Sequence, residues 1–274
     1  METKLLSKYI KRFRESSLMD DLKFRKICES KEAIEEILRT ILDDKELKVL
    51  ESIQQKSIDE PIFHGVILDC RCKISTNEIV DIEVQVALDD NPLYRMRYNG
   101  SILTVENSPK SKEFKYEEIP KLILIMFCEF DYFRMEKPIY EIDRVVRGTS
   151  VTASNGIREI YVNLNADVRE KRLKSLFKIM TTVDDVDNDE FPKLSKKKVE
   201  VNDLYLGGED NMSGLTKEIF LDGKAEGKAE GIEQGIEQGT IATYVKLYKE
   251  KLIKSSDAAR MLNISVDEFL KLVK

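Results

Sequence analysis

Apolar and polar residues alternate along residues 67–87, on both sides of a short polar turn at residues 75–77. Alternation with a period of two predicts β-strands, and two such runs around a short turn predict a β-hairpin. In the second arm, Asp81, Glu83 and Gln85 fall on the same face. Because successive side chains of a strand point to opposite faces, the hairpin presents these three polar groups together.

A turn centred on Thr76 would set the register of this hairpin. Opposed residues then have numbers that sum to 152, which places Asp69 across from Glu83 and Arg71 across from Asp81. Directly opposed side chains share a face with Cβ atoms about 4.5–5.5 Å apart, and two carboxylates that close repel unless a cation lies between them. Carboxylate oxygens suit Mg²⁺ or Mn²⁺. The alternative is a solvated face whose acids pair with the two basic residues of the first arm, and the pattern leaves both interpretations open.

The remaining hydrophobic pattern predicts helices and strands in alternation. Apolar residues at helical spacing predict a helical region over residues 18–42, with Ser30 capping its second part, and a helix over 168–180. A nearly continuous apolar run at 121–130 predicts a central strand covered on both faces. Shorter elements are expected as a helix at 93–105 and strands at 47–53, 139–146 and 158–163.

Three parts are predicted along the chain: a main domain with a helical extension at residues 1–222, a connector at 223–239 and a small helical unit at 240–274. The connector repeats G-K-A-E and then G-I-E-Q, with glycine at every fourth position. Glycine costs about 1 kcal/mol relative to alanine inside a helix, so this segment is interpreted as loosely stable. The last unit is helix-turn-helix-like, with residues 255–257 and Ser265 as helix caps. It would pack on the main domain, on a second subunit or on DNA.

Composition and charge narrow the class of protein. The 274 residues are 42% hydrophobic and 35% charged, which is typical of a globular chain with a highly charged surface. The net charge of −6 argues against a strong nonspecific nucleic-acid binder, although an enzyme with basic residues grouped near its site remains compatible with it. No apolar run reaches the roughly 18–20 residues of a membrane span, and the first residues lack the pattern of a secretory signal. We therefore expect a cytoplasmic protein without a membrane partner.

Two further features limit the candidate chemistry. The four cysteines lie in predicted strands or helices and are interpreted as reduced core residues. The single histidine, His64, argues against histidine-based zinc sites and most catalytic triads. The acidic run at 184–190 and the basic run at 196–198 are expected to be solvated.

The order of helix, strand, hairpin with Asp and then Glu-x-Gln, helix and buried strand resembles the core of the PD-(D/E)XK nucleases. The chain is similar to the recombination-promoting nuclease (Rpn) family, also described as PD-(D/E)XK nuclease family transposases. The similarity is carried, in order, by the stretches D-D-L-K-F-R-K-I, I-L-D-C, D-I-E-V-Q, R-M-R-Y-N-G-S-I-L, Y-E-E-I-P-K-L-I-L-I-M-F-C-E-F-D-Y-F and P-I-Y-E-I-D-R. It implies an α/β fold of the restriction-endonuclease-like type, a mixed central sheet flanked by helices, with a helical C-terminal appendage.

The resemblance also implies a site. Asp69 and Glu83 would hold a divalent metal, Mg²⁺ or Mn²⁺, and Gln85 would join them as a catalytic residue where the wider superfamily carries lysine. Lysine supplies a positive charge to the reaction, whereas glutamine offers only a neutral amide. Asp21 matches the family's N-terminal Asp-x-x-Phe and is expected either to complete the metal site or to cap a helix.

The expected function is metal-dependent DNA endonuclease activity that hydrolyses phosphodiester bonds, with DNA as the partner. Arg95 and Arg97, near the start of the helix after the hairpin, would neutralise a DNA phosphate or else pair with surface acids. The alternative function is a catalytically weak or inactive nuclease-fold module that acts in binding or oligomeric assembly. The C-terminal helical region is the candidate surface for a homo-oligomer.

Overall fold

A computed structural model of the chain describes residues 13, 15–54, 57–58, 66–67, 69–88, 90–111, 113, 115–203, 239–262 and 264–273. By their internal contacts these residues form two compact units, the core unit up to residue 203 and the C-terminal unit from residue 239. The predicted boundary at residue 222 and the predicted connector up to residue 238 lie outside the described residues.

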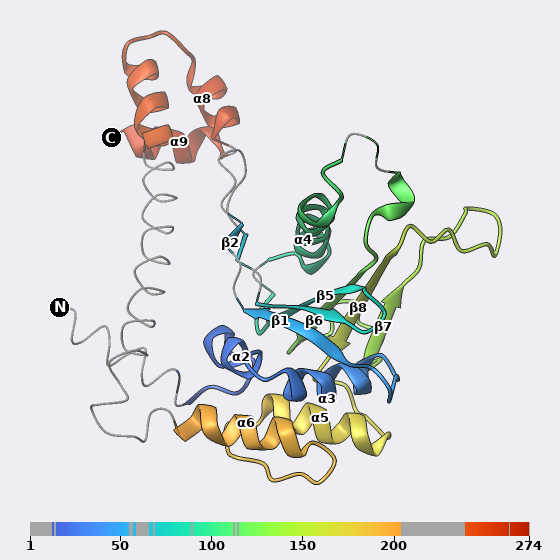
Figure 1. Ribbon diagram of the computed structural model, residues 1–274. Coiled ribbons are helices and arrows are strands. Elements are labelled where there is room, and N and C mark those ends of the chain that lie inside the picture. The colour runs from blue at the N-terminus through green and yellow to red at the C-terminus, as the bar shows by residue number, and fades with distance from the viewer. Residues whose placement is uncertain are drawn as a thin grey trace. The chain divides into compact units, whose positions relative to one another are not determined.

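The core unit is built on a six-stranded mixed sheet with the strand order β1-β4-β5-β6-β8-β7 (Figure 1). Its centre, β5-β6-β8, is parallel, and the strands towards both edges pair antiparallel. The strands are β1 (Val49–Gln54), β4 (Cys70–Ile74), β5 (Ile79–Gln85), β6 (Leu122–Cys128), β7 (Ile139–Ile142) and β8 (Ile157–Asn163). A separate two-stranded ladder joins β2 (Ser57–Ile58) to β3 (Val66–Ile67).

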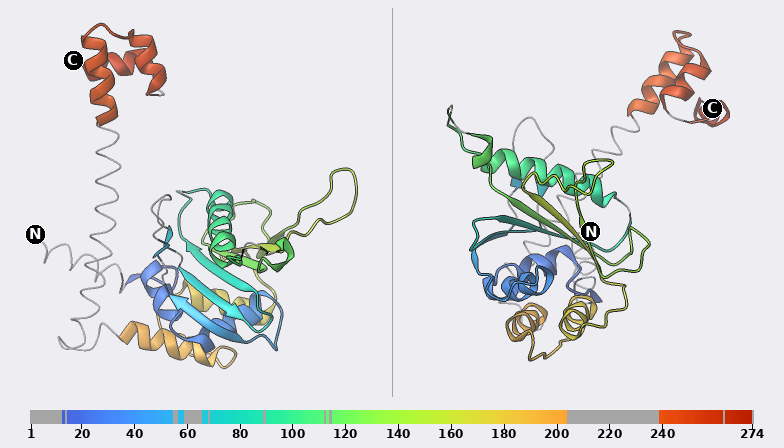
Figure 2. Two further views of the ribbon diagram at one scale, coloured as in Figure 1. Left: turned by 45° about the horizontal axis from the view of Figure 1, so that its top comes forward. Right: turned by 90° about the vertical axis from the view of Figure 1, so that its right-hand side faces the viewer.

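Helices cover both faces of this sheet, with α4 on one face and α3, α5 and α6 on the other side (Figures 1 and 2). They are α2 (Asp21–Ile27), α3 (Lys31–Ile41), α4 (Pro92–Asn107), the 3₁₀ turn η1 (Tyr116–Glu118), α5 (Lys171–Thr181) and α6 (Pro192–Asp203). The predicted cap is confirmed, because the side chain of Ser30 accepts a hydrogen bond from the Ala33 N–H at the start of α3. The predicted fold class, an α/β sheet flanked by helices with a helical C-terminus, is confirmed.

The β4–β5 hairpin has the register that a turn at Thr76 predicts. Arg71 lies opposite Asp81, and the flanking pairs keep the same sum of residue numbers. Asn77 closes the turn with φ 66°, a left-handed conformation that asparagine tolerates better than most residues. Every position of β5 is buried, so the interpretation of this face as solvated is wrong. The polar face of β5 is covered because α4 packs over it.

A close approach brings α4 onto the sheet. A Cβ atom on Gly100 would lie 2.8 Å from Cδ1 of Leu124 on β6, so the helix sits closer than a larger residue would allow. Met96 and Leu103 of α4 are fully buried in the same apolar cluster as Leu124. This packing fixes the start of α4, which reaches over the end of β5.

The basic run at 196–198 is not uniformly solvated, and the prediction is wrong for Lys198. This side chain is fully buried, and its Nζ donates to the carbonyl oxygens of Ile179, at 3.0 Å, and Thr182. Burial lowers the pKa of Lys198 to about 8. The carbonyl groups at the C-terminal end of α5 have few partners within their own helix, so the lysine of α6 satisfies them and joins the two helices.

The C-terminal unit contains a helix at residues 239–249, α8 (Ser255–Met261) and α9 (Val266–Val273). Its small core is centred on Phe269, which packs edge-to-face against Tyr248 with ring centroids 5.5 Å apart. The unit is therefore helical, as predicted, with an apolar centre of its own.

Of the two caps predicted in this unit, one is confirmed. Ser265 Oγ accepts from the Glu268 N–H at 3.2 Å, and the Glu268 carboxylate accepts from the Ser265 N–H at 2.8 Å. This reciprocal pair is a capping box. The other cap is wrong, because Ser255 is already the first residue of α8 and the N-cap is Lys254.

The four cysteines are buried free thiols, as predicted. Within the described parts of the chain, no helix is both long enough and apolar enough to cross a lipid bilayer.

Glu36 of α3 tests how the outer helices are attached. The residue is 8% exposed, and its carboxylate accepts from the N–H groups of Lys193 and Leu194 at the start of α6, at 2.9–3.2 Å. Hydrogen bonds to charged groups contribute about 1.5–3 kcal/mol, so Glu36→Ala should lower the free energy of unfolding by about 2 kcal/mol. Glu36→Gln keeps an acceptor oxygen and should cost less. Urea unfolding of the three proteins makes the comparison, and equal midpoints would show that this contact does not hold α6.

Candidate active site

Asp69 and Glu83 meet at the open end of the β4–β5 hairpin. The backbone N–H of Asp69 donates to Oε1 of Glu83 at 3.2 Å, and the N–H of Val84 donates to Oδ2 of Asp69 at 3.1 Å. Each carboxylate is therefore fixed by the backbone of the neighbouring strand. Asp69 is 3% exposed and Glu83 is fully buried. The structure thus brings together the two residues that the register places opposite each other.

Arg95, on the first turn of α4, lies against both carboxylates. Its Nη2 atom contacts Oε2 of Glu83 and lies 3.6 Å from Oδ2 of Asp69. Asn91 sets the start of this helix, because its side chain accepts from the N–H groups of Leu93, at 3.1 Å, and Tyr94, at 3.4 Å. One guanidinium therefore places a positive charge beside two adjacent carboxylates.

The acids of this site are held in an environment that disfavours their charged forms. Burial raises the pKa of Asp69 well above its ordinary value, and the charges of Glu83 and Asp21 add to this effect. Burial and the charge of Asp81 raise the pKa of Glu83 to about 8, an effect that Arg95 only partly offsets. Such displaced values are common where burial and like charges are combined at functional sites.

Gln85 does not point its amide nitrogen at the carboxylates. Its Nε2 donates to the carbonyl oxygens of Ala87, at 2.9 Å, and Asp90, at 3.0 Å. A primary amide has two N–H donors, and these two bonds engage both. Gln85 therefore holds the segment between β5 and α4.

A cavity of about 540 Å³ opens beside these residues, at the carboxyl end of β5. Asp21, Gln85, Arg95 and Glu129 are among the residues that line it. Ligands of open α/β sheets bind outside the carboxyl ends of the strands. Asp21 thus faces the site, whereas the cap of α2 is supplied by Asp20, whose side chain accepts from the Leu22 N–H.

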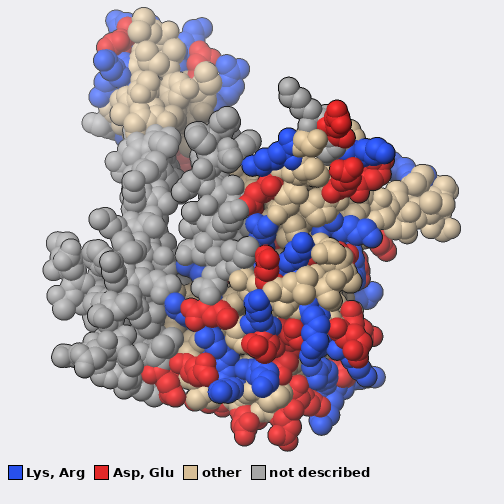
Figure 3. All heavy atoms as spheres, in the orientation of Figure 1, with Lys and Arg blue, Asp and Glu red and all other residues tan. Residues whose placement is uncertain are grey.

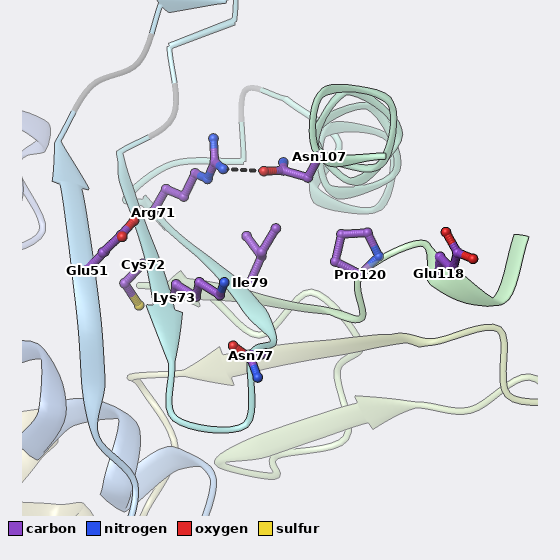
Figure 4. A pocket seen from close by; sticks show the side chains of 9 residues that line it. All are labelled: Glu51, Arg71, Cys72, Lys73, Asn77, Ile79, Asn107, Glu118 and Pro120. Carbon is purple, nitrogen blue, oxygen red and sulfur yellow. Dashed lines mark hydrogen bonds between the residues drawn. The ribbon is translucent and has the colours of Figure 1, made fainter. Parts of the chain in front are cut away.

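Arg97 and Arg71 lie away from the carboxylates. Arg97 is exposed, with its guanidinium 5.0 Å from the centre of the Tyr94 ring. Arg71 lines a second cavity, of about 500 Å³, at the turn end of the hairpin (Figure 4). Its guanidinium there donates to Glu106, at 2.9 Å, and Asn107 at the end of α4. Arg71 therefore ties the hairpin to the helix.

The pair Asp69 and Glu83 fits a hard divalent cation. Both offer carboxylate oxygens, and the positive charge already beside them shows that the position favours a cation. Among the described residues, no group of three or more acidic, histidine or cysteine side chains is placed so that it could hold a metal ion. Mg²⁺ needs only one or two carboxylates when water and substrate phosphates complete its shell.

A mixed sheet whose hairpin carries two converging carboxylates at a strand end defines the restriction-endonuclease-like class of nuclease folds. The family model described as PD-(D/E)XK nuclease family transposase matches residues 18–199. The chain belongs to this family. No curated protein and no solved structure matches the chain.

The sequence predicted no role for two acids of the site, although the alternation places one of them, Asp81, on the same face as Glu83 and Gln85. Asp81 is fully buried, its Oδ2 accepts from Asn99 Nδ2 at 3.5 Å, and burial together with Asp69 raises its pKa to about 7. Glu129 follows β6 and lines the cavity, where it accepts a hydrogen bond from Ser17 at 3.5 Å. Asp81, Glu83 and Gln85 are polar residues at every second position of β5. Glu129 is the charged residue near the end of the apolar run at 121–130, directly after β6, and these two patterns in the sequence mark Asp81 and Glu129.

The raised pKa of Glu83 predicts how the stability of the metal-free protein depends on pH. Between pH 4.5 and about 8, Glu83 is more protonated in the folded protein than in the unfolded chain, so the contribution of Glu83 to the free energy of unfolding falls as pH rises. A glutamine cannot titrate. The stability of Glu83→Gln relative to wild type should therefore increase across this window, by at most about 1.4 kcal/mol per pH unit. Urea unfolding in EDTA at a series of pH values measures the difference, and a difference independent of pH would show that Glu83 titrates normally.

Proposed function

We propose that the chain is a divalent-metal-dependent DNA endonuclease of the transposase and recombination-promoting type, which acts in the cytoplasm and hydrolyses phosphodiester bonds. The observation that carries this proposal is the convergence of Asp69 and Glu83 beside a cavity, within a family of nucleases. Asp69 and Glu83 are the residues that would hold Mg²⁺ or Mn²⁺, and Asp21, which lines the cavity and whose charge acts on Asp69, would complete the site. A bound ion would polarise the scissile phosphate and lower the pKa of a water molecule.

The residues of the chain supply position and charge. The backbone bonds to Asp69 and Glu83 fix the direction of both carboxylates. Arg95 brings a planar guanidinium, which suits a phosphate as well as a carboxylate. Exposed Arg97 lies two residues further along α4 and is available for a phosphate outside the cavity. Together they provide local positive charge in a chain of net charge −6.

Contact with DNA is expected to be local. On the side of the molecule seen in Figure 3, basic and acidic side chains are intermixed over the helices of the core unit. Electrostatic attraction to DNA requires lysines and arginines grouped on one surface. The start of α4, which carries Arg95 and Arg97, is therefore the proposed site of phosphate contact.

The alternative is a nuclease fold that binds or assembles without turnover, and Gln85 in the lysine position favours it. A plasmid-cleavage assay with Mg²⁺, with Mn²⁺ and with EDTA separates the two functions. Cleavage that needs either metal and stops in EDTA supports the enzyme. A protein that shifts DNA or oligomerises, but leaves the plasmid intact at every metal concentration, supports the alternative.

Asp69→Asn tests the role of the first carboxylate. Asparagine keeps an oxygen for the Val84 N–H, while the repulsion between Asp69 and Glu83 disappears. The metal-free variant should therefore be as stable as wild type or slightly more stable. Loss of an anionic ligand should lower cleavage about 100-fold or more. Thermal melts in EDTA and a cleavage assay on the same preparation measure both effects.

The matched control is Asp187→Asn, which removes an exposed carboxylate far along the chain from the hairpin. It should leave both cleavage and melting temperature unchanged. An Asp69→Asn protein that cuts DNA at the wild-type rate would rule out the catalytic role of Asp69. A variant that is less stable and loses activity only in proportion to its folded fraction would assign Asp69 a structural role.

The domain limits are part of the proposal: residues 1–222 as the nuclease domain, 223–239 as a connector and 240–274 as a helical unit for self-association. The separate apolar centre around Phe269 supports this division. A chain ending at Asp222 should fold with an unchanged melting temperature and retain the response of its melting temperature to Mn²⁺. Light scattering should show a smaller oligomer than the full chain. An unfolded circular dichroism spectrum would place the C-terminal unit within the core, and an unchanged mass would remove its role in assembly.

A further inference from the structure

The lysine position and the positive charge of this site belong to two different residues. The residue in the lysine position, Gln85, uses its amide nitrogen on Ala87 and Asp90, the segment that leads into α4. The positive charge at the carboxylates comes instead from Arg95, which α4 carries. Gln85 therefore holds the segment that leads into α4, while Arg95 on α4 carries the positive charge.

The Arg95 side chain faces both the buried carboxylates and the cavity. Its side chain is 28% exposed, while those of Glu83 and Asp69 are 0% and 5% exposed. The guanidinium thus lies over buried carboxylates and also faces the cavity, whose wall it forms together with Asp21 and Glu129. A guanidinium has five N–H donors in a planar fork. It can therefore leave one oxygen ligand for another without losing its charge.

Resting on the proposed nuclease function, we propose that Arg95 is the catalytic cation that replaces the missing lysine. In the metal-free site it lies against Asp69 and Glu83 and offsets part of their negative charge, in the position that suits a divalent ion. When the ion binds to the carboxylates, the guanidinium is displaced towards the cavity, where it contacts the scissile phosphate. Gln85 is a positioning residue that fixes the start of α4 and hence the reach of Arg95.

A cation that must be displaced weakens metal binding, so its removal should strengthen binding. Isothermal titration of the metal-free full chain with Mn²⁺, in alkaline buffer, should give an affinity at least tenfold higher for Arg95→Met than for wild type. Arg95→Lys keeps the charge and should stay within about threefold of wild type. Arg97→Met removes a neighbouring charge whose guanidinium lies over the Tyr94 ring, and the Mn²⁺ affinity of this variant should also stay within about threefold of wild type.

Cleavage should change in the opposite direction. At saturating Mn²⁺, Arg95→Met should cut plasmid about 100-fold more slowly, because a positive charge at the developing transition state is lost. Arg95→Lys should recover most of this rate. A Mn²⁺ affinity of Arg95→Met equal to or weaker than that of wild type overturns the proposal, and so does cleavage at the wild-type rate. If wild type cuts no DNA but Arg95→Met still binds Mn²⁺ tenfold more tightly, the nuclease function fails while the neutralising role of Arg95 stands.

Arg95→Met leaves two buried carboxylates without their cation and is expected to be less stable. A measurement on the wild-type protein therefore accompanies it. In protein labelled with ¹⁵N-arginine, the Nε–H signal that disappears in Arg95→Lys should move when Mg²⁺ is added to saturation. A signal that keeps its position at saturating Mg²⁺ would show that the guanidinium is not displaced, and the proposal would be wrong.

Discussion

Two carboxylates cannot both be ionised out of contact with water unless a positive charge lies beside them. Asp69 and Glu83 are under this constraint, since both are buried and each is fixed by the backbone of the other's strand. The surrounding structure supplies a positive charge beside them. The hairpin register brings the carboxylates together, and α4 carries Arg95 to them. The need for positive charge beside Asp69 and Glu83 also makes this position suitable for a divalent ion. It is therefore a candidate site of catalysis.

The position of α4 is what connects this site to the core. Gly100 allows the helix to lie close on Leu124 of β6, and Asn91 fixes its first turn. Gln85 holds the preceding segment at Ala87 and Asp90. A helix displaced by even a small amount would separate Arg95 from the carboxylates, because a guanidinium contact is short and directional. Apolar packing therefore supports the electrostatics of the site.

The sequence predicted the sheet and the hairpin register because both follow from a period-two pattern and one turn. It also predicted that Asp69 and Glu83 would meet. It did not predict that Arg95 binds them, since the contact joins a helix to a strand and depends on how α4 packs. The burial of Lys198 and the role of Gln85 were not predicted either, because their hydrogen-bond partners are carbonyl groups whose positions depend on the tertiary structure. The start of α8 was misplaced because Ser255 serves a cap and a first turn almost equally well.

In the proposed function, Asp69 and Glu83 together hold one divalent ion. Crystals of the full chain grown with Mn²⁺, with anomalous diffraction recorded at the manganese absorption edge, test it most directly. We expect one strong anomalous peak within bonding distance of a carboxylate oxygen from each residue, with the Arg95 guanidinium turned away from both. A peak bound elsewhere, or Arg95 still lying on the two carboxylates at saturating Mn²⁺ with no peak between them, would contradict it.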